Sequence, residues 1–456
     1  MKYHIVTLGC PKNAVDSEGM DSLLSGQGHQ AVATADDADV IIVNTCSFIA
    51  AARAETLGVL KELGERKRPG QRLIAAGCMA QSHPGEVAAV QGVDATLGTQ
   101  QWMQIGALVG QLAQPVIPLM PAQPAVTIPL TPTAADGQPV SYADWRTTQI
   151  RRTRHTPSAY LKISDGCNLR CAFCTIPSFK GDMRSKPVGA VLAEAQELVA
   201  QGAREIVLVA QHLTDYGRDL GLQDGLAILL EELCQVTPPD IWIRLMYAYP
   251  HGISERLIAT MAAHPQICHY LDMPLQHAHP ATLRRMRRPP DTERTLRLIA
   301  ELRAAMPDIA IRSTFIVGYP GETTAEFNAL LEFLQTAQLD RVGVFRYSRE
   351  PGTPAAELPD QVRPQVIERR WHEVMRLQQT ISHARNRRWI DRTLTVLIEG
   401  NGATDDGSPL SVGRSFRDAP EIDGQVFVWG AHPAGSMVPV KITQATAYDL
   451  WGEAIA

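Results

Sequence analysis

The sequence of 456 residues lacks any long apolar run. No stretch approaches the ~18 residues needed to cross a bilayer, and the apolar start HIVTL is too short for a secretory signal. We therefore expect a cytoplasmic protein that makes no membrane contact. The chain also lacks a surplus of positive charge, because its formal net charge is -5 at pH 7. No general attraction to nucleic acid is expected.

Cysteines are scarce, with eight in the whole chain. Without an export signal these thiols should stay reduced, so cysteines that lie close together are better interpreted as metal ligands than as a disulfide framework. Hydrophobic residues at 45% exclude disorder over the full length. Because the chain is too long for one core of ordinary size, we expect about three domains.

Residues 1–113 alternate short β-like runs with helical stretches. The runs are HIVTL, DVIIVNT and RLIAAG, and the first two helices are expected from about Asp16 and about Ser47. Alternation at this spacing predicts an α/β domain in which helices cover a parallel sheet. The pattern stops at Pro115, and the proline-rich residues 114–152 are predicted to form a linker.

Residues 153–383 resume the alternation of strands and helices. About six units without an obvious reversal predict a (β/α)6-type parallel barrel, partial or complete, with its active site at the carboxyl ends of the strands. Thr323 to Glu326 has the spacing of a capping box, which predicts a helix start. A charged helix from about Arg363 to Arg388 closes the region. Residues 386–456 hold short β-like runs cut by Gly, Asp, Asn and Pro, and predict a small antiparallel β-barrel.

Three cysteines, Cys167, Cys171 and Cys174, form a CxxxCxxC directly after the first strand of the predicted barrel. Three thiolates in such a loop can hold three irons of a 4Fe–4S cluster. The fourth iron then stays open to a small molecule with an amino and a carboxylate group. The alternatives are a zinc site that lacks its fourth ligand, or three unrelated buried thiols.

A second set of cysteines lies far apart in the sequence. Cys10, Cys46 and Cys78 each follow one of the three β-like runs, at separations of 36 and 32 residues. In a parallel sheet the carboxyl ends of the strands meet at one edge, so these thiols can converge there on a second cluster with an open iron. The alternative is three small residues at strand ends. Cys234 and Cys268 are interpreted as core cysteines.

The segment CNLRCAFC resembles the radical S-adenosylmethionine superfamily, and the triplet of Cys10, Cys46 and Cys78 before it narrows this to the methylthiotransferases. The resemblance covers nearly the whole chain. It implies an amino-terminal methylthiotransferase domain over 1–113, a radical core over 153–383 and a TRAM domain over 386–456.

Three stretches are similar to one branch of that family. They are LGCPKNAVDSE, SDGCNLRCAFCTIPSFKG and the ending YDLWGE. The resemblance implies methylthiolation of the β-carbon of an aspartate in small-subunit ribosomal protein twelve. The branch that modifies tRNA usually has Gln-Met-Asn where this chain has Pro11, Lys12 and Asn13.

The resemblance also implies the cofactors, which are two 4Fe–4S clusters and S-adenosylmethionine used as radical source and as methyl donor. The cluster on Cys167, Cys171 and Cys174 would start the radical, and the other would carry the sulfur. An external electron donor and a sulfur source would be needed, and no acid, base or nucleophilic side chain is expected. The implied contacts to S-adenosylmethionine are Phe173, Gln211, Ile316 and Gly318. The alternative for Phe173 is an aromatic residue of the core.

Two positions depart from the family pattern and receive no role here. His212 stands where an acidic residue is common, and Glu322 lies one place later than the usual spacing to the glycines before it. A third feature, the run LRRMRRPP from Leu283 to Pro290, is basic. It is either a solvated face or a docking site for ribosomal RNA or for acidic groups of the substrate assembly, so nucleic-acid contact is not the primary expectation.

Charge in the last domain favours a protein substrate. Between Ile390 and Ala456 there are four basic and nine acidic residues, a net charge of -5. Such a domain repels phosphates and suits a basic protein partner, although a solvated acidic surface without a partner is the alternative. A tRNA methylthiotransferase would instead predict a basic last domain. A non-catalytic iron–sulfur electron carrier would not need open iron positions.

Overall fold

The computed structural model describes residues 1–112, 126–127, 144–148, 152 and 156–455. Most of the expected linker at 114–152 lies outside the described residues. The chain divides into two compact units. The first comprises Met1–Arg154, Asp165–Leu169 and Cys174–Ala190, and the second comprises His155–Ser164, Arg170–Phe173 and Val191–Ala456. None of the described helices combines the length and the apolar character that crossing a membrane requires.

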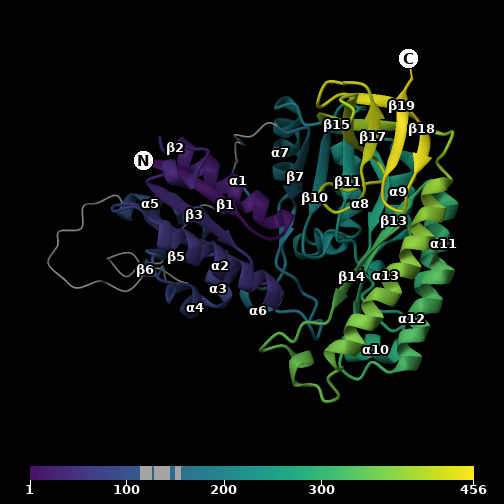
Figure 1. The fold of residues 1–456 in the computed structure, drawn as a ribbon, viewed down its shortest axis with the longest axis horizontal. Coiled ribbons are helices and arrows are strands. Elements are labelled where there is room, and N and C mark those ends of the chain that lie inside the picture. Colours follow the sequence, from purple (N-terminus) through teal and green to yellow (C-terminus); the bar gives the residue numbers. More distant parts are fainter. Residues whose placement is uncertain (113–125, 128–143, 149–151, 153–155, 456) are drawn as a thin grey trace. The chain divides into compact units, whose positions relative to one another are not determined.

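The first unit contains a six-stranded parallel sheet with the order β2-β1-β3-β4-β5-β6, which confirms the predicted α/β domain (Figure 1). Its strands are β1 (Lys2–Thr7), β2 (Gln30–Ala31), β3 (Val40–Thr45), β4 (Arg72–Gly77), β5 (Ala95–Gly98) and β6 (Val126–Thr127). Alternate residues of β3 enter the cores on opposite faces of the sheet, with Val40 and Ile42 in one and Ile41 and Val43 in the other. Burial on both faces explains why this strand is a continuous apolar run.

Helices of the first unit follow the strands. They are α1 (Pro11–Gly26), α2 (Ala50–Arg66), α3 (Cys78–Ser82), α4 (Pro84–Ala88), α5 (Ile105–Leu112) and α6 (Ile176–Lys180). The expected start of α1 at about Asp16 is wrong by five residues. Pro11 occupies the first helical position, where its missing N–H costs no hydrogen bond, and Cys10 is the N-cap. The start of α2 is likewise Ala50 rather than about Ser47.

The second unit contains the predicted partial barrel, an open sheet of six parallel strands in the order β14-β13-β12-β11-β10-β7. The strands are β7 (Ser158–Lys162), β10 (Glu205–Val209), β11 (Trp242–Leu245), β12 (Ile267–Asp272), β13 (Ala310–Val317) and β14 (Arg341–Arg346). Short strands β8 (Ser164–Asp165) and β9 (Arg184–Ser185) pair with each other.

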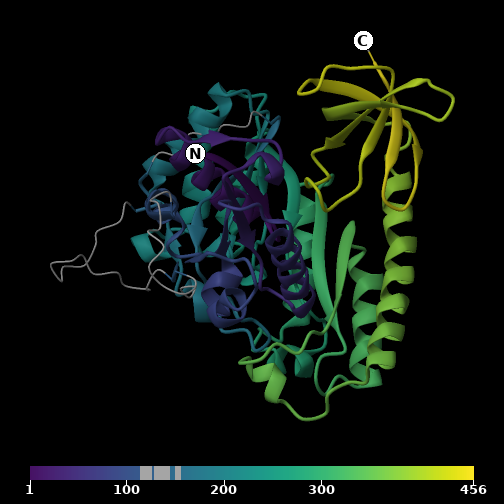
Figure 2. The same cartoon turned by 60° about the vertical axis from the view of Figure 1, so that its left-hand side comes forward.

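Helices connect the barrel strands. They are α7 (Val188–Ala200), α8 (Gly225–Val236), α9 (Glu255–Ala263), α10 (Pro280–Arg285), α11 (Thr292–Ala305) and α12 (Thr324–Ala337). The capping box predicted at Thr323 and Glu326 starts α12. The predicted charged helix is α13 (Pro364–Arg387). Figure 2 shows α13 running toward the small carboxyl-terminal barrel.

The carboxyl-terminal barrel is closed by five strands in the order β15-β16-β17-β19-β18. They are β15 (Thr393–Ala403), β16 (Pro409–Ser415), β17 (Val426–Trp429), β18 (Met437–Ala445) and β19 (Leu450–Ala454). The first four strands correspond to the β-like runs LTVLIEG, LSVGRS, GQVFVWG and SMVPVKITQATAY, whereas β19 was not expected. It is short, and it pairs antiparallel with β18 but parallel with β17. The rest of the barrel is antiparallel, as predicted.

A buried ion network joins this barrel to the amino-terminal ends of the parallel strands. Glu205, the first residue of β10, accepts from Arg244 Nε at 2.6 Å and from Arg414 Nη2 at 2.5 Å. Ser158 Oγ donates to the same carboxylate at 2.7 Å. Arg244 also donates to the Phe416 carbonyl at 2.6 Å, so one guanidinium bridges β11 and the small barrel. The small barrel therefore occupies the amino-terminal end of the strands and leaves their carboxyl ends to the site.

Replacing Glu205 by Gln should destabilise the second unit by about 3–5 kcal/mol, because two buried guanidinium groups lose their counter-charge. Its matched control is Asp240→Asn, which breaks the exposed ion pair with Arg204 and should cost no more than about 1 kcal/mol. Urea unfolding followed by tryptophan fluorescence measures both. Equal losses of stability in the two variants would contradict the role of the network.

The contribution of Glu205 should also depend on pH. Burial alone would raise the pKa of its carboxyl, but Arg244 and Arg414 outweigh burial and lower the pKa from 4.5 to about 2. As the pH falls, the unfolded chain binds the proton first, so the stabilisation present above pH 4.5 is lost as the pH falls toward 2. The stability difference between the wild type and Glu205→Gln should shrink over that range, and a constant difference would contradict it.

Candidate cluster-binding sites

Strand register brings Cys10, Cys46 and Cys78 to one edge of the amino-terminal sheet. Strands β1, β3 and β4 are neighbours, and Thr45 pairs with Gly77 at the last position of β3 and β4. Cys46 and Cys78 are the next residues, so they leave the sheet at the same level. Thr7 pairs with Asn44, which places Cys10 one residue beyond the level of Cys46. The convergence of these positions at the carboxyl edge agrees with the expectation from the sequence.

Asn13, on the first turn of α1, ties the three cysteine-bearing segments together. Its side-chain Nδ2 donates to the carbonyls of Leu8 and Thr45, both at 2.9 Å. Cys78 Sγ donates to its Oδ1 at 3.5 Å. With 1% of its surface exposed, Asn13 forms these bonds out of solvent. Sequence reasoning missed it, although an asparagine in both family variants of the Pro11 to Asn13 motif was a usable signal.

Close packing sets the position of Cys46. Gly9 has φ +90°, and a Cβ added there would lie 2.7 Å from both Cβ and Sγ of Cys46. Only glycine therefore allows the thiol of Cys46 to lie directly over the residue before Cys10. The close approach follows from the register, because Gly9 is at the level of Cys46 across the β1–β3 pair.

Burial favours the protonated form of the Cys46 and Cys78 thiols. It raises the pKa of the Cys46 thiol, and it raises the pKa of Cys78 to about 12 although Lys180 opposes the shift. A metal cluster bound by Cys46 and Cys78 would therefore displace these protons.

Lys180, at the end of α6, is a buried cation beside this edge. Its Nζ lies 2.9 Å from Asp165 Oδ2 and 3.9 Å from Asp16 Oδ2, and it donates to Thr99 Oγ1 at 3.1 Å. Burial alone would lower the pKa of this ammonium, but Asp165 and the other nearby anionic groups outweigh burial and raise it. Lys180 therefore stays charged, and its position close to Cys78 supplies positive potential where an anionic cluster would sit. No pattern in the sequence indicated Lys180.

The donor set of this edge fits an iron–sulfur cluster. All eight cysteines of the chain are free, and the three here are soft sulfur donors on separate backbone segments. No group of three or more His, Cys, Asp or Glu side chains in the described part of the chain is arranged to hold a single metal ion. A 4Fe–4S cube is held at three different irons, so its ligands need not meet at one point.

The second triplet, Cys167, Cys171 and Cys174, lies on one continuous stretch of chain after β8. Cys167 and Cys174 belong to segments of the first unit, and Cys171 belongs to a segment of the second. In the first unit, Cys167 N donates to the Gly181 carbonyl at 3.1 Å. In the second unit, Ala172 N donates to the Met286 carbonyl at 3.0 Å, and Ala172 O accepts from Ala355 N at 2.8 Å. Backbone hydrogen bonds thus hold the stretch at Cys167 within the first unit, and they hold the stretch at Cys171 within the second unit.

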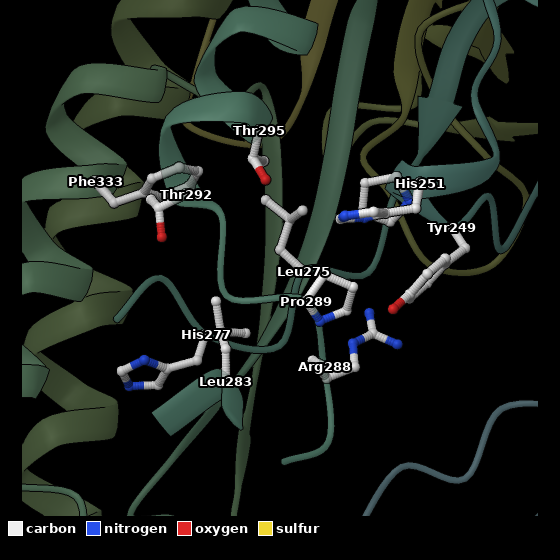
Figure 3. Close-up of a pocket in the computed structure, with 11 residues that line it drawn as sticks. Tyr249, His251, Leu275, His277, Leu283, Arg288, Pro289, Thr292, Thr295 and Phe333 are labelled. Atoms are coloured by element: carbon white, nitrogen blue, oxygen red, sulfur yellow. The ribbon is translucent and has the colours of Figure 1, made fainter. Parts of the chain in front are cut away.

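The basic run from Leu283 to Pro290 is not one uniform face. Arg284 and Arg287 are exposed, as a solvated face requires. Arg285 instead forms an ion pair with Glu326 at 2.8 Å, and Arg288 is buried with 9% of its surface exposed. Figure 3 shows the Arg288 guanidinium beside the ring of Tyr249.

Two of the four residues expected to contact S-adenosylmethionine lie together. Phe173 packs on an apolar cluster that contains Ile316 of β13. Gly318 follows β13, and its N–H donates to the Glu322 carboxylate. Gln211 follows β10, which is separated from β13 by β11 and β12, and lies outside that cluster.

The two departures from the family pattern have clear surroundings. Glu322 is buried, and its Oε2 accepts from the N–H of Gly318 and, at 3.0 Å, from that of Tyr319, while Arg370 lies 3.3 Å from Oε1. It therefore holds the loop after β13 in spite of its shifted position. The ring of His212 meets the ring of Tyr249 edge-on at 5.1 Å, and burial lowers the pKa of His212 to about 4. This histidine is therefore neutral at pH 7.

Three family models match the chain. Residues 2–98 match the one described as uncharacterized protein family UPF0004, residues 161–334 match the radical SAM superfamily, and residues 390–455 match the TRAM domain. With the partial parallel barrel and the closed small barrel, these matches define a radical SAM enzyme that carries a TRAM domain.

Curated relatives span the full length. A protein of Chloroflexus aurantiacus named ribosomal protein uS12 methylthiotransferase RimO is 87% identical and covers 100% of both chains. A relative of the same name from Roseiflexus castenholzii is 70% identical, covering 100% of this chain and 96% of its own. One from Geobacter sulfurreducens is 42% identical, covering 100% and 99%. The chain belongs to the RimO family of radical SAM methylthiotransferases.

Solved structures share the fold at low sequence identity. The radical S-adenosylmethionine methyltransferase TsrM of Kitasatospora setae has a TM-score of 0.56 at 16% identity and covers 78% of this chain and 76% of its own. The cobalamin-dependent radical enzyme OxsB has a TM-score of 0.50 at 11% identity, covering 83% and 56%. These likenesses support the architecture of a radical SAM enzyme.

Replacing Gly9 by Ala should destabilise the metal-free protein by roughly 2–4 kcal/mol. About 1 kcal/mol comes from the left-handed backbone conformation and the rest from overlap with Cys46. Gly28→Ala is the matched control, because Gly28 has φ +82° and an added Cβ there meets nothing within 4 Å. Urea unfolding compares the two. If Gly9→Ala cost no more than Gly28→Ala, the packing of Cys46 against residue 9 would be refuted.

Proposed function

We propose that the chain methylthiolates the β-carbon of an aspartate in ribosomal protein uS12. The observation that carries the proposal is the presence of two cysteine triplets in a chain that is 87% identical over its full length to a relative named for this activity. The convergence of Cys10, Cys46 and Cys78 at one sheet edge supports it independently of the name. The tRNA-modifying alternative has no such relative among the closely matching chains described above.

In this proposal, Cys167, Cys171 and Cys174 ligate the radical-forming 4Fe–4S cluster, and Cys10, Cys46 and Cys78 ligate a second cluster. When bound, the two clusters and S-adenosylmethionine supply radical formation, sulfur and the methyl group. The clustered position of Phe173 and Ile316 supports contacts of both with the adenine end of S-adenosylmethionine. Gly318 and Gln211 remain proposed contacts from the resemblance.

The target C–H bond is not acidic enough for a side-chain base. The residues of the chain therefore bind the cofactors, bury the cluster ligands and hold the cysteine segments in place. Burial of Cys46 and Cys78 keeps water from the edge where sulfur is transferred. Asn13 fixes the spacing of the three segments, and Lys180 offsets negative charge. No catalytic acid or base is assigned to the chain.

The surface of the TRAM barrel supports a basic protein partner. Arg414 and Arg417, two of its four basic residues, are turned inward and buried. The exposed basic residues are Arg392 and Lys441. The exposed acidic residues are Asp391, Glu399, Asp405, Asp406, Glu421 and Glu453. The exposed charges of the barrel therefore sum to -4, close to the -5 of the whole domain, and this acidic surface favours a basic ribosomal protein over RNA.

Family membership also supports the proposed domain bounds, partners and location. The methylthiotransferase domain spans 1–113, the linker 114–152, the radical core 153–383 and the TRAM domain 386–456. An external one-electron donor and a sulfur source act as partners, and the enzyme works in the cytoplasm, where its ribosomal substrate is made.

Separable cysteine variants test the two cluster assignments. Cys171→Ala should abolish formation of 5′-deoxyadenosine from S-adenosylmethionine, because the radical cluster loses a ligand. Cys46→Ala should retain part of that cleavage but yield no methylthiolated product. Cys234→Ala, which alters a cysteine outside both triplets, is the control and should behave as the wild type. Iron should be about eight per chain after anaerobic reconstitution and about half of that in either triplet variant.

The substrate is tested with purified uS12 and with small ribosomal subunits. Mass spectrometry should find a methylthio group on one aspartate after incubation with the reconstituted enzyme, S-adenosylmethionine and a reductant. Methylthiolated product from the Cys46→Ala variant would overturn the assignment of the sulfur site. Modification of tRNA without modification of uS12 would overturn the assignment of uS12 as the substrate.

A further inference from the structure

Arg288 is a buried cation without a carboxylate partner among the residues that the structure describes. Only 9% of its surface is exposed. Its neighbour in the same basic run, Arg285, has the Glu326 carboxylate at 2.8 Å, and the buried Arg244 has Glu205. An unpaired buried charge is costly, so Arg288 is suited to a negative group that the folded chain alone does not provide.

The contacts of Arg288 aim it at the cysteine loop. Nη1 donates to Cys171 Sγ at 3.7 Å, and Nη2 donates to the Pro274 carbonyl at 2.5 Å. The guanidinium also lies over the Tyr249 ring, 4.4 Å from its centre (Figure 3). These contacts come from three places, namely the loop after β12, the loop after β11 and the cysteine loop itself.

The backbone holds Arg288 and the loop in register. Arg288 N donates to the Leu283 carbonyl at 2.8 Å, and Ala172 N, next to Cys171, donates to the Met286 carbonyl at 3.0 Å. Main-chain hydrogen bonds therefore hold the backbone of both segments, and the contacts to Pro274 and Tyr249 position the guanidinium beside the thiol.

A neutral thiol is a weak acceptor for such a strong donor. Once Cys171 ligates an iron, its sulfur is a thiolate, and a charge-assisted hydrogen bond from a guanidinium becomes strong. Hydrogen bonds to the sulfurs and the local charge are among the factors that set the reduction potential of an iron–sulfur cluster. A nearby cation stabilises the reduced cluster more than the oxidised one, because reduction adds a negative charge.

We propose that Arg288 is a positioning residue of the radical cluster, which donates a hydrogen bond to the Cys171 thiolate, offsets the cluster's negative charge and raises its reduction potential. This inference rests on the proposed role of Cys171 as a cluster ligand. It assigns to one arginine of the LRRMRRPP run a function in electron uptake rather than in docking.

The test is an EPR-monitored redox titration of the full-length chain in which Cys10, Cys46 and Cys78 are replaced by Ala, so that one cluster remains. In that background, Arg288→Gln should make one-electron reduction at least about tenfold less favourable, a shift of ~59 mV to more negative potential. Arg288→Lys keeps the charge but loses the paired donors, and should shift the potential by less. Arg284→Gln removes an exposed charge of the same helix region and should leave it unchanged.

The proposal predicts that the reduction potential falls from the wild type to Arg288→Lys and further to Arg288→Gln. A purely structural role for Arg288 would alter the stability of the variants without producing this order of potentials. If circular dichroism shows that Arg288→Gln is unfolded, a more negative potential in Arg288→Lys still supports the proposal. An unchanged reduction potential in the folded variants overturns the proposal. If the potential is unchanged but the affinity for S-adenosylmethionine falls, the guanidinium binds the carboxylate of that molecule instead, and the proposal is likewise overturned. Failure of the parent protein to bind about four irons would instead overturn the ligand assignment of Cys171.

Discussion

The amino-terminal site depends on the parallel register of β1, β3 and β4. Parallel strands point the same way, so residues that follow their last pairs must leave the sheet at one edge. The pairing of Thr45 with Gly77 then decides that Cys46 and Cys78 emerge at the same level. A shift of one residue in either strand would turn a thiol to the opposite face. Asn13 secures this register from the side, because one amide bonds segments that follow two of the strands.

The same constraint orders the second unit. Its parallel strands have a carboxyl end that carries the cysteine loop and Arg288, and an amino-terminal end that carries Glu205 and Arg244. The buried charges at the two ends have different partners. At the amino-terminal end Glu205 has two guanidinium partners within 2.6 Å. These ion pairs connect the parallel strands to the small barrel. At the carboxyl end Arg288 has backbone, ring and sulfur contacts instead, an arrangement that becomes favourable when an anion is present.

Much of the fold was predictable because it depends on local pattern. Continuous apolar runs such as VIIVNT gave the buried parallel strands, and the capping box at Thr323 gave a helix start. Strand β19 was not predictable, since LWGEA is short and stabilised by pairing with β17 and β18 rather than by its own pattern. At the site, the cysteine spacing indicated the six thiols. Asn13 and Lys180 were missed, and Arg288 was noted only as part of a basic run, because their contacts join distant segments and the sequence does not display such contacts.

Strand β19 has a consequence for how the small barrel assembles. It fills the gap between β17 and β18, so before it arrives both strands present unpaired backbone N–H and C=O groups to solvent. Open edges of this kind recruit strands from other chains. The barrel's resistance to aggregation thus depends on the five residues of β19, Leu450–Ala454. Any fusion or truncation that delays the pairing of β19 lengthens the time during which the edges of β17 and β18 are exposed.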